Sequence, residues 1–184
     1  MRGLAAPAAA AFAALAGLAG LGVLGAHAQH DSVPAGDHLG MEHGESWDDY
    51  RARAGASLGG VPGGTPVFAL VTFDRPAGFA DAAAVLDGVG RVDAVVFPVM
   101  AARAVPEPVA GEGRAGVFAR EARQAGRAAG AAGADYTPDA MSAAVVHDTG
   151  DTLRSVAGRA GVGAVETLPA DAVWGAFGIA PTAH

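Results

Sequence analysis

Histidines and acids gather in the stretch HDSVPAGDHLGMEH, residues 30–43. Imidazole and carboxylate groups bind zinc, nickel or copper, so His30, His38 and His43 are candidate metal ligands. The spacing of His38 and His43 does not place both on one face of a helix, and the glycines around them make ordering costly. No strong metal template matches the pattern. A solvated, acid-rich linker is the favoured interpretation, with a metal-binding protein as the alternative.

A second candidate for chemistry is VVHDTGDT, residues 145–152. Asp148-Thr149-Gly150 has the triplet of aspartic proteases, but such enzymes need two facing aspartates that share a proton, and the sequence has no second copy. His147 beside Asp148 could act as the general-base pair of a small hydrolase, although nothing in the sequence supplies a nucleophile. The plainer interpretation is the end of a strand followed by a helix cap.

The stretch GEGRAG, residues 111–116, matches G-x-G-x-x-G and opens a predicted helix. A dinucleotide site also requires a strand directly before it, and here Pro106 and Pro108 precede it instead. We read the stretch as a flexible loop and predict no cofactor.

Three arginines, Arg120, Arg123 and Arg127, fall on one face of the helix predicted from Arg114 to about Ala132. The opposite face carries Phe118, Ala122 and Ala125. Guanidinium groups in a row could meet an anionic lipid, a cell-wall phosphate or an acidic protein. They are equally typical of the solvated side of an amphipathic helix.

Composition excludes several classes. All 12 basic residues are arginine, against 19 acidic ones, and the net charge of −7 argues against nucleic-acid binding. The absence of cysteine excludes disulfides, thiol catalysis and thiolate metal sites. Arginine without lysine, together with abundant alanine and glycine, is typical of a GC-rich genome such as that of an actinobacterium.

The N-terminal segment predicts export. Residues 3–26 carry no charge and follow Arg2, while acids dominate the far side, so we expect the N-terminus inside the cell and the C-terminus outside. Ala26 and Ala28 fit the small-x-small motif of signal peptidase, with cleavage before Gln29. The apolar run is longer than the ~7–15 residues of a signal core and could span a bilayer at ~20 residues. Residues 1–28 are therefore a signal peptide or a signal anchor, and the protein is secreted or membrane-anchored.

Residues 29–66 predict a flexible linker, rich in proline and glycine. Within it, the stretch from Glu45 to Ala54 could form a short helix with Ser46 as its cap and Trp47 and Tyr50 on one side.

Residues 67–184 predict one folded domain. Strands at 67–73 and 92–99 flank a helical pattern, and strands at 141–147 and 162–168 flank a second one that ends at Gly161. Two βαβ units of this size predict an α/β (α+β) fold, a ferredoxin-like sandwich of two βαβ units with the helix at 114–132 inserted between them. The units align when Ala69 and Val71 are matched to Ala143 and Val145. Trp174, Phe177 and Ile179 are expected to close the end of the core.

The second unit, LRSVAGRAGVGAVETLP (Leu153 to Pro169), resembles the closing helix and strand of the propeptide/inhibitor domains of subtilisin-like proteases. A leucine begins the helix, a Gly-Val turn follows, and a Val-Glu strand closes the unit. The resemblance covers about 17 residues and implies a ferredoxin-like fold that acts as a folding chaperone or inhibitor of a protease.

Taken together, the residues favour a non-enzymatic, exported or membrane-tethered bacterial protein with an extracytoplasmic domain that binds a protein or an envelope component. The contact surfaces expected from the sequence are the arginine face of the inserted helix and an exposed sheet edge. The alternative is an extracytoplasmic metal-binding protein or small hydrolase that uses the residue 30–43 segment or His147 and Asp148.

Overall fold

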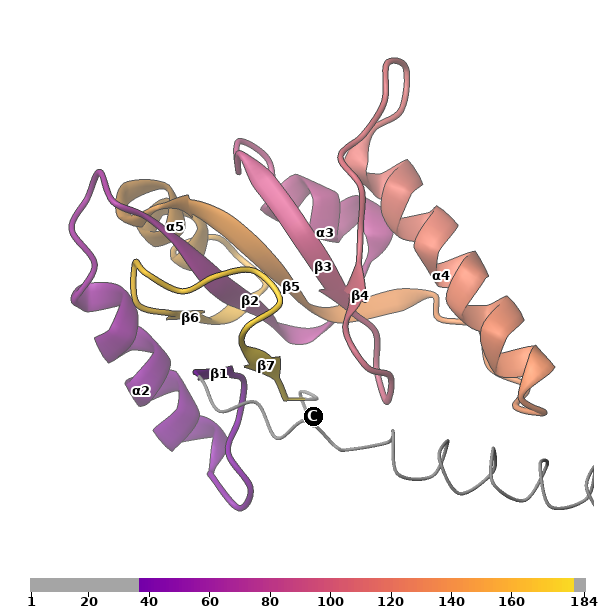
Figure 1. The fold of residues 1–184 in the computed structure, drawn as a ribbon, viewed down its shortest axis with the longest axis horizontal. Helices are drawn as coiled ribbons and strands as arrows, with labels where there is room; N and C mark the ends of the chain where they lie inside the picture. The colour runs from indigo at the N-terminus through magenta and orange to yellow at the C-terminus, as the bar shows by residue number, and fades with distance from the viewer. Residues whose placement is uncertain (1–36, 181–184) are drawn as a thin grey trace, which may run out of the picture. The chain divides into compact units, whose positions relative to one another are not determined.

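The central sheet of the described chain has five strands in the order β4–β3–β5–β2–β6 (Figure 1). The computed structural model describes residues 37–180. The strands are β2 (Pro66–Gly78), β3 (Arg91–Val96), β4 (Arg103–Ala104), β5 (Ala140–Thr149) and β6 (Val162–Thr167). Every neighbouring pair is antiparallel. It follows that β2 runs parallel to β3 with β5 between them, and β5 runs parallel to β6 with β2 between them.

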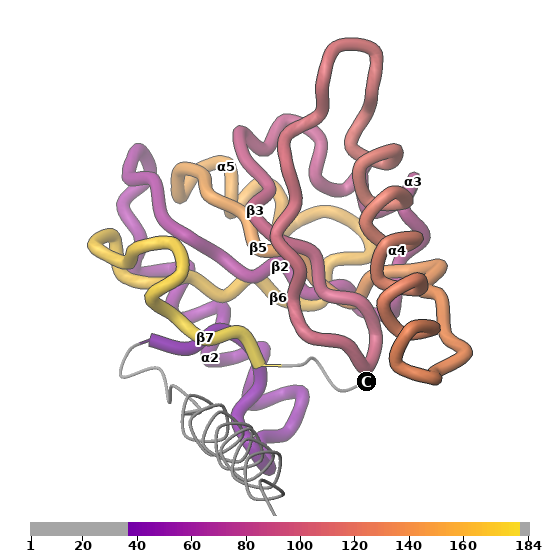
Figure 2. Tube along the Cα trace, turned by 45° about the vertical axis from the view of Figure 1, so that its right-hand side comes forward, coloured from indigo at the N-terminus to yellow at the C-terminus, as the bar shows by residue number. Residues whose placement is uncertain are grey.

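Three helices cover one face of this sheet, which we call the helix face. They are α3 (Phe79–Val85), α4 (Arg114–Ala131) and α5 (Gly150–Ala157). α3 connects β2 to β3, α5 connects β5 to β6, and α4 lies beside α3 (Figure 2). Buried side chains of all three helices join those of the strands in the main core, which contains Phe73, Leu86, Phe118, Leu153 and Val165 among others. The predicted mixed α/β architecture is confirmed, including both strand–helix–strand units and the helix between them.

The C-terminal end of α5 differs from the prediction. α5 stops at Ala157 with Gly158 as its C-cap, not at Gly161. Gly161 instead has a φ of +87° in the turn before β6, a backbone conformation that glycine adopts without steric cost. The pattern that suggested a longer helix came from alanines and glycines, which fit a turn as readily as a helix.

The predicted flexible linker at 29–66 is wrong for its described part. Residues 37–65 contain β1 (His38–Leu39) and a helix of 13 residues, α2 (Trp47–Gly59). Ser46 caps α2, as predicted, and its side chain accepts a hydrogen bond from the Asp49 N–H. α2 runs one turn or more beyond the predicted stretch and packs on β6 through Tyr50, Ala54 and Leu58, which are buried. The folded domain therefore begins before Pro66.

The opposite face of the sheet, here called the second face, is covered by the two ends of the described chain. β1 pairs in parallel with β7 (Gly178–Ile179), and the segment that leads from β6 to β7 crosses in front of the sheet (Figure 1). The buried residues of this layer are Leu39, Leu70, Ala94, Val96, Ala143, Val145 and Leu168. Phe177 and Ile179 pack against them, as predicted for the end of the core. Within residues 37–180, no helix is long and apolar enough to cross a bilayer.

The internal repeat is correct in its order of elements but wrong in its register. Ala69 and Val71 belong to the core on the helix face, whereas Ala143 and Val145 face the other way. Successive side chains of a strand point to opposite faces, so a shift of one residue exchanges the two faces. In β5, the residues that share the helix face are Ala144 and Val146.

Candidate functional site

Four rings cluster on the second face where β2 begins and β5 ends. Phe68 pairs with His147 across the two strands, and their ring centroids are 4.6 Å apart. Phe177 lies 5.3 Å and Trp174 5.9 Å from Phe68, and these two rings are 5.8 Å from each other. We call Phe68, His147, Trp174 and Phe177 the aromatic cluster. Its separations are those at which aromatic rings attract one another.

The aromatic cluster continues into solvent through Val173 and Trp174. The side chain of Val173 is 65% exposed and that of Trp174 is 40% exposed. The other large exposed apolar side chains of the described residues, Val99 and Val109, are on separate loops. Apolar side chains that are exposed next to an aromatic cluster are typical of a contact surface, and tryptophan is enriched at the centres of such contacts. Trp174 was predicted to help close the end of the core, but its side chain is partly exposed to solvent.

The exposed pair also lies beside the start of the described chain. A hollow of about 180 Å³ is lined by Asp37 and Asp171 together with Val173 and Phe177. The Gly178 N–H donates to the Asp37 carbonyl at 3.1 Å. The loop between β6 and β7 is thus next to the point where the chain arrives from residues 1–36.

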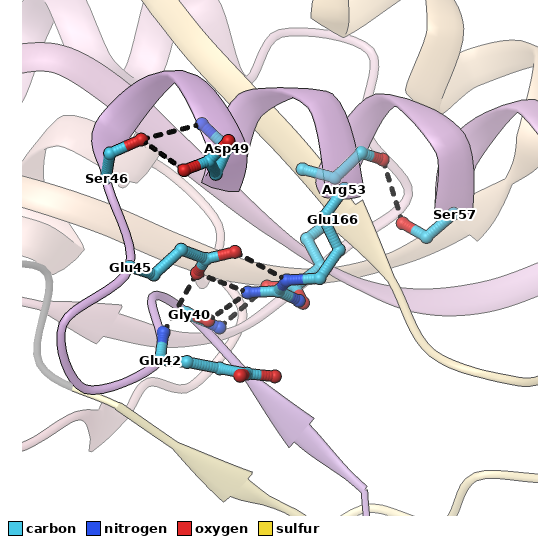
Figure 3. A network of polar contacts seen from close by, with 9 residues as sticks. Gly40, Glu42, Glu45, Ser46, Asp49, Arg53, Ser57 and Glu166 are labelled. Atoms are coloured by element: carbon cyan, nitrogen blue, oxygen red, sulfur yellow. Dashed lines mark hydrogen bonds and ion pairs between the residues drawn. The ribbon is translucent and has the colours of Figure 1, made fainter.

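A second polar feature joins residues 40–45 to α2 and β6 (Figure 3). The Arg53 guanidinium donates to both carboxylate oxygens of Glu45 at 2.9 Å, to the Gly40 carbonyl at 2.9 Å, and to the Glu166 carboxylate. The Gly40 N–H donates to the other oxygen of Glu166 at 2.7 Å. Glu166 is only 3% exposed. We call Gly40, Glu45, Arg53 and Glu166 the arginine network.

The arginine network shifts the pKa values of its members in different directions. Hydrogen bonds from Arg53 lower the pKa of Glu45 from 4.5 to about 2. Burial raises the pKa of Glu166 above its ordinary value, more than Gly40 and Arg53 lower it. Hydrogen bonds to Glu45 raise the pKa of Arg53, so its charge is fixed. The hydrogen bonds of these groups attach residues 40–45 to α2 and β6.

The two glutamates predict opposite pH dependences of stability. Glu45 has a lowered folded-state pKa, so its stabilising contribution is present above pH 4.5 and is lost as the pH falls towards about 2. Glu166 has a raised folded-state pKa, so the folded state loses stability as the pH rises above 4.5 through the raised value. Urea unfolding of the wild type, Glu45→Gln and Glu166→Gln across this range measures both effects. We expect the stability advantage of the wild type over Glu45→Gln to shrink on acidification, and that over Glu166→Gln to shrink on alkalinisation. Differences that do not vary with pH would refute the assignment.

Of the predicted metal ligands, His38 and His43 are exposed and line one hollow of about 390 Å³ with Met41, Glu42 and Arg53. Residues 37–180 contain no group of three histidine, cysteine or acidic side chains positioned to hold a metal ion. His30 lies outside the described residues, as do Ala26 and Ala28 of the cleavage motif. A metal site that includes His30 therefore stays a prediction.

His147 and Asp148 do not form a pair. They are consecutive residues of β5, so their side chains point to opposite faces, and the His147 ring contacts that of Phe68. The Asp148 carboxylate accepts hydrogen bonds from the N–H groups of Gly90 and Thr149, both at 2.6 Å. Burial acts to raise the pKa of Asp148, but these hydrogen bonds outweigh it and the pKa is lowered. Thr149 is the N-cap of α5, so the interpretation as a strand end and helix cap is confirmed.

The three arginines of α4 are not equivalent. Arg123 and Arg127 are exposed, while Arg120 forms an ion pair with Glu112. The opposite side of the helix is buried, as predicted, through Phe118, Ala122 and Ala125. The freely presented charge of this face is thus that of Arg123 and Arg127, two residues one turn apart.

The expected sheet edge is also restricted. α2 packs on β6 at one side of the sheet, and the Thr167 N–H donates to the Ser57 hydroxyl at 2.9 Å. At the other side, β4 is two residues long. Short or covered edges offer little to an added strand.

Comparison with known proteins gives no match: no family model, no curated protein and no solved structure is similar to this chain.

Proposed function

We propose that this chain is a non-enzymatic, exported or membrane-tethered bacterial protein whose domain lies outside the cytoplasm and binds another protein or an envelope component. Support for the location comes from the charge-free segment at 3–26, its flanking Arg2 and the acidic residues that follow. A domain without cysteine is compatible with an oxidising compartment, since it has no thiol to protect.

The observation that carries the binding function is the exposure of Val173 and Trp174 on the aromatic cluster. Burying such side chains against a partner is favourable, at about 25 cal/mol per Å² of apolar surface removed from water. The charged groups, in contrast, are mostly used within the fold. Four arginines donate to backbone carbonyl groups: Arg53, Arg114, Arg154 and Arg159.

The proposal includes a ferredoxin-like sandwich as the fold of the domain. It is supported by the order β3–β5–β2–β6, by the two interleaved strand–helix–strand units, and by helices α3 and α5 that pack on one face. In this scheme α4 is the inserted helix, and α2, β1 and β7 are additions that cover the edge and the second face.

The similarity of Leu153–Pro169 to propeptide/inhibitor domains supplies one partner class that can be tested directly. Leu153 is the fourth residue of α5 and Val165 lies in β6, and both side chains are buried. A subtilisin-like protease incubated with the purified chain would be inhibited if the similarity extends to function. Degradation of the chain without inhibition would contradict this partner class and leave the wider binding function in place.

The function as a whole is tested by localisation and by photocrosslinking in a GC-rich Gram-positive host. A photoreactive residue is placed at Trp174, at Arg123 or at the exposed Val109, which serves as a matched control. We expect the domain to be accessible to protease from outside the cell, and an envelope component to be crosslinked at 174 more strongly than at 109. Crosslinking at 123 alone would move the contact surface to α4. A cytoplasmic product without crosslinks at any position would refute the proposal.

A further inference from the structure

The exposed residues Val173 and Trp174 lie on a loop next to the point where the chain enters the domain. Asp37, the first described residue, lines the same hollow as Val173 and accepts a hydrogen bond from Gly178. β1 and β7 continue this contact in parallel. The chain that precedes Asp37 therefore enters the domain on the side that carries the loop between β6 and β7.

The length of that tether is limited. Eleven residue steps separate Ala26, at the end of the charge-free segment, from Asp37. A fully extended chain covers about 3.5 Å per residue, so the tether spans roughly 40 Å at most. If the segment at 3–26 stays in the bilayer, Asp37 and the loop beside it remain within this distance of the lipid surface.

Tethering changes the affinity that a contact needs. A short flexible linker gives an effective concentration in the millimolar range, so a weak intrinsic interaction is populated without further binding energy. Two exposed apolar side chains would be insufficient for a free protein in solution. A domain that cannot leave the surface needs less binding energy from the same two side chains.

The residue types also fit a lipid surface. Tryptophan is enriched at membrane–water interfaces, where its ring lies among the headgroups, and an adjacent valine adds apolar area. By contrast Val109, with similar exposure, is on the loop between β4 and α4, and both views show this loop far from β1 and β7 (Figures 1 and 2).

We propose that Val173 and Trp174 form a membrane-contact site that holds the domain against the outer surface of the bilayer in which the N-terminal segment is anchored. This inference rests on the anchored form of the proposed function. The ligand is the headgroup region of the lipid bilayer, and the protein contributes one tryptophan and one valine on a short loop.

Charge beside the loop sets the lipid preference. Asp37 and Asp171 are exposed and border the same hollow. Their carboxylates are repelled by an anionic lipid surface, and this repulsion weakens as salt is added. The contact should therefore be strongest on zwitterionic lipid and should weaken at low salt as the anionic fraction rises.

Because the chain has no cysteine, a single introduced cysteine can carry a spin label at a defined site. Full-length Val173→Cys and Val109→Cys variants are labelled and reconstituted into phosphatidylcholine vesicles. Collisions with oxygen, which concentrates in lipid, and with a water-soluble nickel chelate are then compared. We expect the oxygen-to-nickel ratio at 173 to be several-fold higher than at 109, and to fall when Trp174→Ser is added or when phosphatidylglycerol replaces phosphatidylcholine at low salt.

A second measurement leaves Val173 unchanged. In a Trp47→Phe background Trp174 is the one remaining tryptophan, because the chain has two. Its fluorescence should be quenched by phosphatidylcholine brominated near the headgroup. Circular dichroism of each variant verifies that the domain is folded.

The outcomes separate the inference from the function on which it rests. Vesicles that carry the chain but give equal ratios at 173 and 109, with no quenching of Trp174, would overturn the membrane contact and leave the anchor intact. Protection of 173 in host membranes but not in pure lipid would also overturn it, since a protein would then occupy the loop. A chain that does not float with vesicles, or that begins at Gln29 when isolated from the host, would remove the anchored form and with it the inference, leaving the secreted form.

Discussion

Replacing Arg53 with alanine is expected to lower the free energy of unfolding by about 3 kcal/mol at pH 7, because the change leaves a buried carboxylate without its cation. Glu166 is 3% exposed and would retain only the Gly40 N–H as a partner. The side chain of Arg53 itself is 35% exposed, so water can reach part of the vacated space and the loss should stay below that of a fully buried pair.

Arg51 provides a matched control on the same helix. It is exposed, and alanine at this position should change stability by no more than about 0.5 kcal/mol, as is usual for surface substitutions. Urea unfolding followed by circular dichroism measures both variants. Equal stabilities for Arg53→Ala and Arg51→Ala would show that the arginine network does not stabilise the domain.

Two further variants separate charge from geometry. Adding Glu166→Gln to Arg53→Ala removes the buried charge and should recover part of the lost stability. Arg53→Lys keeps the charge but not the planar guanidinium that reaches Glu45, Gly40 and Glu166 together, so it should be destabilised by an intermediate amount. Without Arg53 the pKa of Glu166 rises further, and the destabilisation should decrease on mild acidification because protonation removes the unpaired charge.

The strand–helix–strand units could be predicted because their apolar residues follow the periods of strands and helices. Val67 to Phe73 is apolar except for Thr72, because both faces of the strand are covered, and Phe79 to Leu86 follows the helical spacing. The helix cap at Thr149 was also predictable, since its side chain accepts a hydrogen bond from the backbone three residues later.

Of residues 37–59 only a short helix from Glu45 to Ala54 could be predicted, and there is a physical reason why its length and its packing on the sheet could not. α2 buries only Tyr50, Ala54 and Leu58, and these three residues among charged and small ones leave little apolar periodicity. The arginine network joins residues that are more than one hundred positions apart, and nothing local in the sequence indicates that Arg53 faces Glu166. The aromatic cluster likewise depends on the register of β2 with β5, in which Phe68 opposes His147. Register errors exchange the faces of a strand, as the internal repeat illustrates.

Leu39→Ala is the second variant for which we expect a large effect. The free energy of unfolding should fall by about 2–4 kcal/mol, as is typical of a large-to-small change in a core. Leu39 has no exposed surface and packs with Leu70, Val96 and Val145 on the second face. β1 contributes only two residues to its sheet and few backbone hydrogen bonds, so the burial of this side chain is an important part of its attachment. Val109→Ala, which removes carbon atoms from an exposed site, is the matched control and should leave the urea midpoint unchanged.

The loss can appear in two forms, and proteolysis distinguishes them. If β1 separates locally, the urea midpoint of the remaining domain changes little and cleavage near residues 40–44 accelerates. If the second face is part of one cooperative core, the midpoint falls and no early cleavage occurs. No change in either measurement would contradict the packing of Leu39.

Leu39 also connects stability to the proposed membrane contact. Among the described strands, β7 pairs with β1 alone, and the loop that carries Val173 and Trp174 leads directly into β7. Local separation of β1 should therefore release this loop and lengthen the effective tether, because Asp37 no longer holds Gly178. A spin label at 173 would then lose its lipid contact in the Leu39→Ala variant, although every exposed side chain of the loop is unchanged. A label that keeps its contact would mean that Val173 and Trp174 reach the bilayer without help from the fold, and that the position of Asp37 beside them has no part in the contact.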